Sequence, residues 1–131
     1  MISLDEHKAI VLWASDCAKR VLKYYEKEYP KDDRPRKAIK AGRDWIRSKI
    51  SVGEARTMAL AAHAAARDAN TESARAAARS AGHAAATVHV AGHARAAANY
   101  AVKAVAAANT EKEHEWQSKH IPKNLLPFTR K

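Results

Sequence analysis

The stretch AGHAAATVHVAGHARAAANY, residues 81–100, belongs to a long alanine-rich segment that decides the fold. Between residues 55 and 108 about half of all residues are alanine, which has the highest helix propensity of any residue. Because an alanine side chain buries little area, such helices gain by approaching one another closely, near the lower end of the roughly 8–10 Å interaxial range. The segment therefore predicts close-packed helices, and no strand pattern competes with it.

The same stretch contains its own interruption. Gly82 and Gly92 are candidate kinks, and the run TVHV at 87–90 is a β-branched weak point in a helical pattern that continues to about Asn109. A single helix of this length is unusual in so small a domain. We expect a break or bend near residues 88–93, which folds the segment into a close-packed hairpin and gives about five helices.

Caps and prolines predict the other helix ends. Ser3 with Glu6 and Ser51 with Glu54 form capping boxes, because each hydroxyl can accept from the amide three residues on while the glutamate reaches back. The remaining signals are a stop at Tyr29-Pro30 and new starts at Asp33, with Pro35 in the first turn, and at Thr71.

The tail from Glu111 predicts a short helix and an extended strap, which contains Ile121-Pro122 and Leu125-Leu126-Pro127. The fold class that follows is all-α, a single-domain antiparallel helical bundle over residues 1–131 with an alanine-rich C-terminal hairpin.

Chain length, composition and net charge limit the possible functions. A chain of 131 residues fits one domain, and no stretch approaches the roughly 18 to 20 apolar residues of a membrane span. The start, MISLDEHK, lacks the apolar core of a secretory signal, and the one cysteine suits a reducing cytoplasm, so we expect a cytoplasmic protein. The formal net charge of +10 favours an acidic partner, either protein or nucleic acid, although a solvated surface with no such partner stays open.

Four histidines form the first candidate site. His89 and His93 lie one turn apart, about 40° from each other on a helix, which is a spacing that can hold two corners of a metal site. In an unbroken helix His83 points about 120° away from His89, while His63 could face them from the preceding helix. A polar pocket that serves packing is the favoured interpretation, no metal is assigned, and a bound ligand remains the alternative.

No catalytic residue is predicted. Glu111-Lys-Glu-His114 is half of a di-iron motif, but the chain has no second Glu-x-x-His. Cys17 has no adjacent cation to lower its pKa, and Ser80 and Thr87 have no acid nearby in sequence to complete a triad. The glycines are isolated and form no phosphate-binding loop. We expect no enzyme and no cofactor.

The second candidate site is basic. Arg36, Lys40, Arg43 and Arg47 follow one another at steps of four, three and four, within about 60° on a helical wheel. With Arg34 added, they form a row that could bind an acidic protein or phosphates, or could be a solvated outer face. The chain carries no recognisable nucleic-acid motif and no exposed aromatic interleaving, so any nucleic-acid binding would be nonspecific. Pairing with a second copy through an alanine face is left open.

Several segments resemble small all-helical bacterial immunity proteins of polymorphic toxin systems, similar to the fifth numbered immunity family. The matching segments follow one another along nearly the whole chain: WASDCAKRVL, YPKDDRPRKAIKAGRDWIR, ISVGEAR, ALAAHAAARDA, ARAAARSAGHAAATVHVAGHARAAANYAVKAV and EWQSKHIPKNL. The resemblance implies a helical bundle that binds a cognate toxin and blocks it, with no reaction of its own. Since an inhibitor of a basic nuclease cleft is expected to be acidic, this basic chain suits an acidic partner protein better.

Overall fold

All regular structure in residues 2–122, which the computed structural model describes, is helical. In chain order the elements are α1 (Leu4–Glu26), α2 (Arg34–Ile46), α3 (Val52–Asp68), α4 (Glu72–Ala86), α5 (His93–Ala104), the 3₁₀ turn η1 (Ala107–Asn109) and α6 (Thr110–His120). The prediction of an all-α bundle is confirmed, with α6 as the short helix expected in the tail. No helix within these residues is long and apolar enough to cross a membrane.

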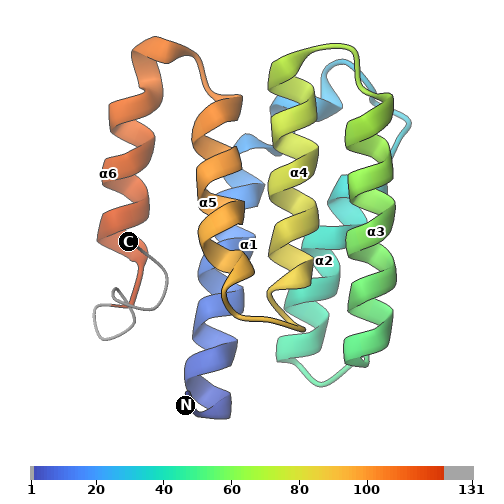
Figure 1. Ribbon diagram of the computed structural model, residues 1–131, viewed down its shortest axis with the longest axis vertical. Helices are drawn as coiled ribbons and strands as arrows, with labels where there is room; N and C mark the ends of the chain where they lie inside the picture. The colour runs from blue at the N-terminus through green and yellow to red at the C-terminus, as the bar shows by residue number, and fades with distance from the viewer. Residues whose placement is uncertain (1, 123–131) are drawn as a thin grey trace.

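The helices form two layers. In Figure 1, α3, α4 and α5 stand side by side in front, α1 and α2 lie behind them, and α6 flanks α5 at one edge. Helix α4 is central, because it packs against α1, α2, α3 and α5. The two layers therefore enclose the core around α4, and the outward face of α2 is left uncovered.

Large side chains in the core come mainly from α1, which buries Ile10, Trp13, Val21, Leu22 and Tyr25. The buried side chains of α3 and α5 are all alanine, and those of α4 are alanine with Ser80 and Gly82. Close approach is extreme at Gly42 of α2, where an added Cβ would lie 2.7 Å from Oγ of Ser15. Small side chains thus occupy the buried faces of α3, α4 and α5, and glycine lets α2 approach α1 closely.

The local signals identified the starts of α1, α3 and α4. In both capping boxes the predicted pair of hydrogen bonds is present, and Thr71 accepts from the amide of Ala74. The predicted break is confirmed, because α4 ends at Ala86 and α5 begins at His93. Within the turn, the Thr87 hydroxyl donates to the carbonyl of His83 at 2.8 Å.

Three expectations about helix ends need correction. Asp33 occupies the N-cap of α2 but forms no cap hydrogen bond; its carboxylate pairs instead with Lys37 at 3.4 Å, and Asp32 accepts from the Arg34 amide. Helix α1 ends at Glu26, before Tyr29-Pro30, and α5 ends at Ala104 rather than near Asn109. The expected strap at Leu125-Leu126-Pro127 lies outside the described residues.

Helix α6 is attached by polar contacts. The Trp13 indole N–H donates to the carbonyl of Gln117 at 3.0 Å, and the Gln117 amide donates to the carbonyl of Ala98 at 2.9 Å. Arg20 forms two hydrogen bonds, of 2.9 and 3.1 Å, with the buried carboxylate of Glu113. These contacts place α6 on the side of α1 and α5, and α6 makes no substantial packing against α2.

Candidate functional site

The four cations that sequence spacing placed in one row of α2 line one hollow between α1 and α2, of about 390 Å³. We call these four, Arg36, Lys40, Arg43 and Arg47, the basic face. Leu22 and Ile39, both buried, also line the hollow, and Lys19, Asp44 and Lys49 complete its wall. The structure therefore brings the predicted row together around a cavity, and adds cations from two other segments.

Three members of the basic face have carboxylate partners within the chain. Arg36 forms two 2.7 Å hydrogen bonds with Glu26, Lys40 donates to Asp44 at 2.6 Å, and Arg43 lies 2.9 Å from Asp16. These contacts orient the cationic groups around the hollow. The basic face is consequently better ordered than a row of free solvated side chains would be.

Two of these contacts also lower the pKa of the carboxyl group that accepts them. The hydrogen bonds from Arg36 lower the pKa of the Glu26 carboxyl, and the hydrogen bond from Lys40 lowers the pKa of Asp44. The charges of Lys49 and Arg47 lower the pKa of Asp44 further. Both carboxylates therefore stay ionised and hold their partners across the physiological pH range.

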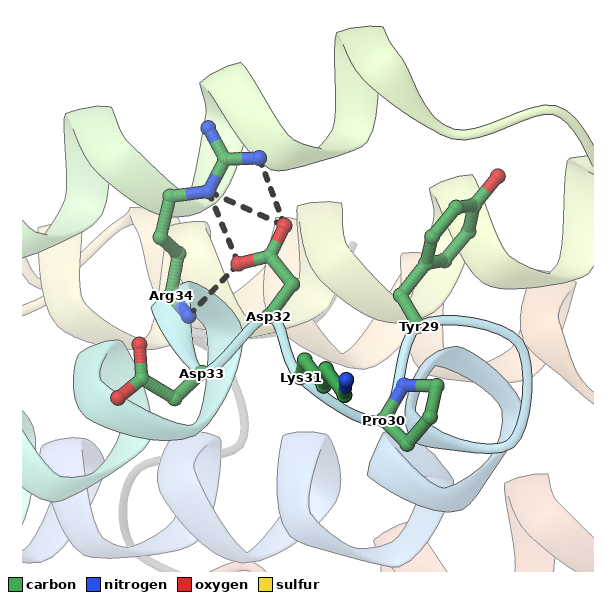
Figure 2. Close-up of a pocket in the computed structure, with 6 residues that line it drawn as sticks. All are labelled: Tyr29, Pro30, Lys31, Asp32, Asp33 and Arg34. Carbon is green, nitrogen blue, oxygen red and sulfur yellow. Dashed lines mark hydrogen bonds and ion pairs between the residues drawn. The ribbon is translucent and has the colours of Figure 1, made fainter.

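Arg34 does not line this hollow. Figure 2 shows its guanidinium directed at the carboxylate of Asp32, while the side chain of Asp33 points away from the pair. Asp32 accepts from the Arg34 side chain at 2.7 to 3.2 Å and from the Tyr25 hydroxyl at 2.6 Å, and Arg34 also reaches Asp68. These hydrogen bonds hold the pKa of Asp32 well below its usual range. Arg34 therefore secures the turn that leads into α2.

Three cations at the hollow form no ion pair with another residue in the described range 2–122: Lys19, Arg47 and Lys49. All three are exposed. Sequence reasoning included Arg47 but missed the other two. Lys19 reaches the hollow only because α1 packs beside α2, which helical spacing within α2 could not reveal.

Lys49 is brought to the hollow by the end of α2. There the Lys49 amide donates to the carbonyl of Asp44 and the Ser48 amide to that of Trp45, both at 2.9 Å, which is the Schellman pattern. Ser48 takes the position usually occupied by glycine and has a φ of 62°. A glycine there would have signalled the turn in the sequence, whereas serine concealed it.

The histidines gather differently from the prediction. His63, His83 and His93, which we call the histidine cluster, lie together, with ring centroids 4.7 Å apart for His63–His83 and 5.3 Å for His83–His93. The Nδ1 atoms of His83 and His93 are 3.2 Å apart, and the ring of Tyr100 stacks on His83. His89 does not join this cluster, because the helix breaks between His89 and His93 and His89 lies exposed in the turn.

The surroundings of the histidine cluster disfavour positive charge. Burial lowers the pKa of His63 to about 4, and the nearby charge of Arg79, whose Nη1 lies 2.9 Å from Nδ1 of His63, adds to this. Burial likewise lowers the pKa of His83 to about 4. Within residues 2–122, no group of three or more His, Cys, Asp or Glu side chains is arranged to hold a metal ion. The cluster consists of neutral rings stacked between α3, α4 and α5.

The candidate nucleophiles take part in structural contacts. Cys17 is fully buried, and burial raises the pKa of its thiol. The hydroxyl of Ser80 donates to the carbonyl of Ala97 at 2.7 Å, and that of Thr87 donates to His83. Within the Glu111–His114 motif, Glu113 is paired with Arg20. Each of these groups contributes to helix packing.

A family of known proteins matches nearly the whole chain. A family model described as "Imm-5 like putative immunity protein" matches residues 1–124 of the chain. No curated protein and no solved structure matches.

Proposed function

The chain belongs to the Imm-5-like family of immunity proteins, and on this premise we propose that it is a non-enzymatic protein that binds a cognate toxin and neutralises it. The family match over residues 1–124 is the observation that carries this proposal. A rigid bundle that blocks another protein needs a surface and no chemistry of its own. The structural contacts of Cys17, Ser80 and Thr87 agree with such a role.

The basic face is the surface that we assign to the toxin. It is exposed on the outer layer, its cations converge on one hollow, and the net charge of the chain is +10. Charge complementarity then calls for an acidic patch on the toxin, which would also speed the encounter of the two proteins. Arg34 supports this surface indirectly, because it holds the turn before α2.

A two-stage experiment tests the proposal. The tagged chain is used to capture partners from lysate of its source organism, with and without nuclease treatment, and each captured protein is then expressed alone or with the chain in a bacterial host. We expect one nuclease-resistant partner that stops growth when alone and permits growth when co-expressed. Captured proteins that never affect growth, or material that disappears with nuclease, would overturn the proposal.

The interface is tested in the same growth assay with Lys40→Glu combined with Arg43→Glu. We expect this variant to lose protection, with circular dichroism confirming that it remains helical. The folding control is needed because Arg43 also pairs with Asp16. Undiminished protection by a folded variant would exclude the basic face as the interface.

A further inference from the structure

The hollow between α1 and α2 has an excess of positive charge that the chain itself does not neutralise. Among the residues that the structure describes, six cationic side chains line it, from α1, from α2 and from the turn after α2, and Asp44 is the only acidic one. Asp44 is already bound to Lys40. Lys19, Arg47 and Lys49 therefore face a shared space without a carboxylate within ion-pair distance anywhere in residues 2–122.

The wall of the hollow is apolar below its charged rim. Leu22 and Ile39, at 2% and 3% exposure, line it. Lysine and arginine side chains have aliphatic stems that line a cavity while their charged ends stay in water. The hollow thus offers room for one apolar side chain, surrounded by groups that bind carboxylates.

This combination favours protein over nucleic acid as the occupant. Single-stranded nucleic acid is typically bound by aromatic side chains on which bases stack, and no aromatic residue of the described range 2–122 lines this hollow. Lysine and arginine bind carboxylates well, and arginine can do so in a bidentate manner. An acidic peptide segment satisfies both the rim and the apolar interior.

We propose that this hollow receives an acidic segment of the toxin, in which one apolar side chain enters the cavity and flanking carboxylates bind Lys19, Arg47 and Lys49. The proposal rests on the toxin-binding function proposed above and names the part of the partner that is recognised. Arg36, Lys40 and Arg43 form the ordered part of the hollow's lining, since their intrachain carboxylates hold them in place before the partner arrives. Such preorganisation reduces the entropic cost of binding.

The turn after α2 supports this assignment. Ser48 keeps a left-handed backbone conformation that serine rarely adopts, and the residues on either side of it, Arg47 and Lys49, both reach the hollow. Strain of this kind is often found where a functional side chain has to be positioned. In this turn, the backbone conformation at Ser48 brings Lys49 to the hollow, next to Arg47 at the end of α2.

The test compares two triple charge reversals. Lys19→Glu/Arg47→Glu/Lys49→Glu removes the unpaired cations of the hollow and breaks none of the seven ion pairs found within residues 2–122. Arg56→Glu/Lys112→Glu/Lys119→Glu changes the net charge equally on α3 and α6, at exposed residues that form no ion pair with the rest of residues 2–122. Comparing the two triple variants separates an effect of the hollow from an effect of overall charge.

The first readout is nuclear magnetic resonance with a synthetic peptide, Asp-Glu-Phe-Glu-Asp, as the probe. We expect its shifts to concentrate on residues of the hollow, and its affinity to fall about 100-fold in the hollow variant and less than about threefold in the control variant, because each reversal replaces attraction by repulsion. Shifts spread over the whole surface, or equal losses in both variants, would overturn the proposal. So would tighter binding of an oligonucleotide of matched charge in the same hollow.

The second readout is protection from the captured toxin in the growth assay. If the hollow variant protects as well as the unaltered chain does, the docking proposal fails while the immunity function stands. If the peptide binds in the hollow but no captured protein is toxic, the immunity function fails while the hollow remains an acidic-peptide site.

Discussion

The basic face and the histidine cluster are both groups of basic residues that the fold brings together, and the fold treats them in opposite ways. On α2 the cations stay at the surface, where Glu26, Asp44 and Asp16 lie beside them. Between α3, α4 and α5 the histidines are partly buried, and burial lowers their pKa. One region keeps its charge and the other loses it.

This difference indicates which of the two candidate sites is suited to binding a partner. A charged group that remains hydrated can exchange water for a partner's carboxylate, whereas a neutral ring packed among helices contributes mainly to stability. We therefore expect changes in the histidine cluster to alter the free energy of unfolding, and changes at the hollow to alter binding. Four predictions test this comparison, in order of decreasing expected effect on stability.

The largest effect is expected from Gly82→Val. An added Cβ at Gly82 would lie 2.7 Å from ring atoms of His63, and the two further methyl groups of valine would worsen the overlap. Overpacking of this kind costs about 2–3 kcal/mol of unfolding free energy, measurable by urea denaturation followed by circular dichroism. The control is Gly53→Ala, where the added Cβ would meet only Ser51 at 3.8 Å. A loss below about 0.5 kcal/mol at Gly82 would mean that the His63 ring moves freely.

Asp32→Asn should have the next largest effect, of about 2 kcal/mol, because the amide cannot accept all the hydrogen bonds that Arg34 and Tyr25 donate to the carboxylate. The neighbouring Asp33→Asn is the matched control. Its pair with Lys37 is about 60% exposed on both sides, so that change should cost less than about 0.5 kcal/mol. Equal effects at the two positions would contradict the assigned role of Asp32 in holding the turn.

Acidification should destabilise the bundle through the histidine cluster. His63 and His83 have pKa values of about 4 in the fold against an ordinary value of 6.5, so the unfolded chain takes up protons first as the pH falls. The contribution of these two histidines to the free energy of unfolding is complete above pH 6.5 and is lost progressively toward pH 4. Allowing for partial exposure, we expect a loss of about 1–2 kcal/mol across that window.

Urea denaturation at several pH values measures this loss, and His83→Gln is the informative variant. It should flatten the pH dependence whatever it does to the stability at pH 7.5. An unchanged slope in this variant would show that His83 does not remain neutral in the fold.

The smallest effect on stability is expected from Glu26→Gln. The pair with Arg36 is 52% exposed on the arginine side, so its loss should cost less than about 0.5 kcal/mol. The change also removes a negative charge near the hollow, and we expect the acidic probe peptide to bind about two- to threefold more tightly. Weaker binding would show that the order imposed by Glu26 matters more than its charge.

Local features of the fold were predictable because they depend on residues close together in sequence. The capping boxes at Ser3 and Ser51 involve residues three positions apart, and the break before His93 follows from β-branched residues and glycine in a helical run. Asp33 shows the limit of this reasoning, since its carboxylate had two local partners and took Lys37 instead of the cap. A short-range pattern indicates which contacts are available, and packing selects among them.

The candidate site was predictable only in part. The spacing of Arg36, Lys40, Arg43 and Arg47 predicted a common face, and all four line one hollow, with Arg47 at the C-cap of α2, because helical periodicity is a property of the chain itself. The membership of Lys19 and Lys49 was not visible, because one comes from another helix and the other depends on an unusual backbone conformation at Ser48.

The sequence by itself determined the helical class, the caps at Ser3, Ser51 and Thr71, the small side chains that let the helices pack closely, and the net charge. Only the tertiary structure decided which basic residues stay charged and which lie next to each other. The physical reason is that ionisation depends on burial and on neighbouring charges, and these come from distant parts of the chain. His83 meets His93 across a turn and Arg43 meets Asp16 across two helices, and neither contact is encoded in local spacing.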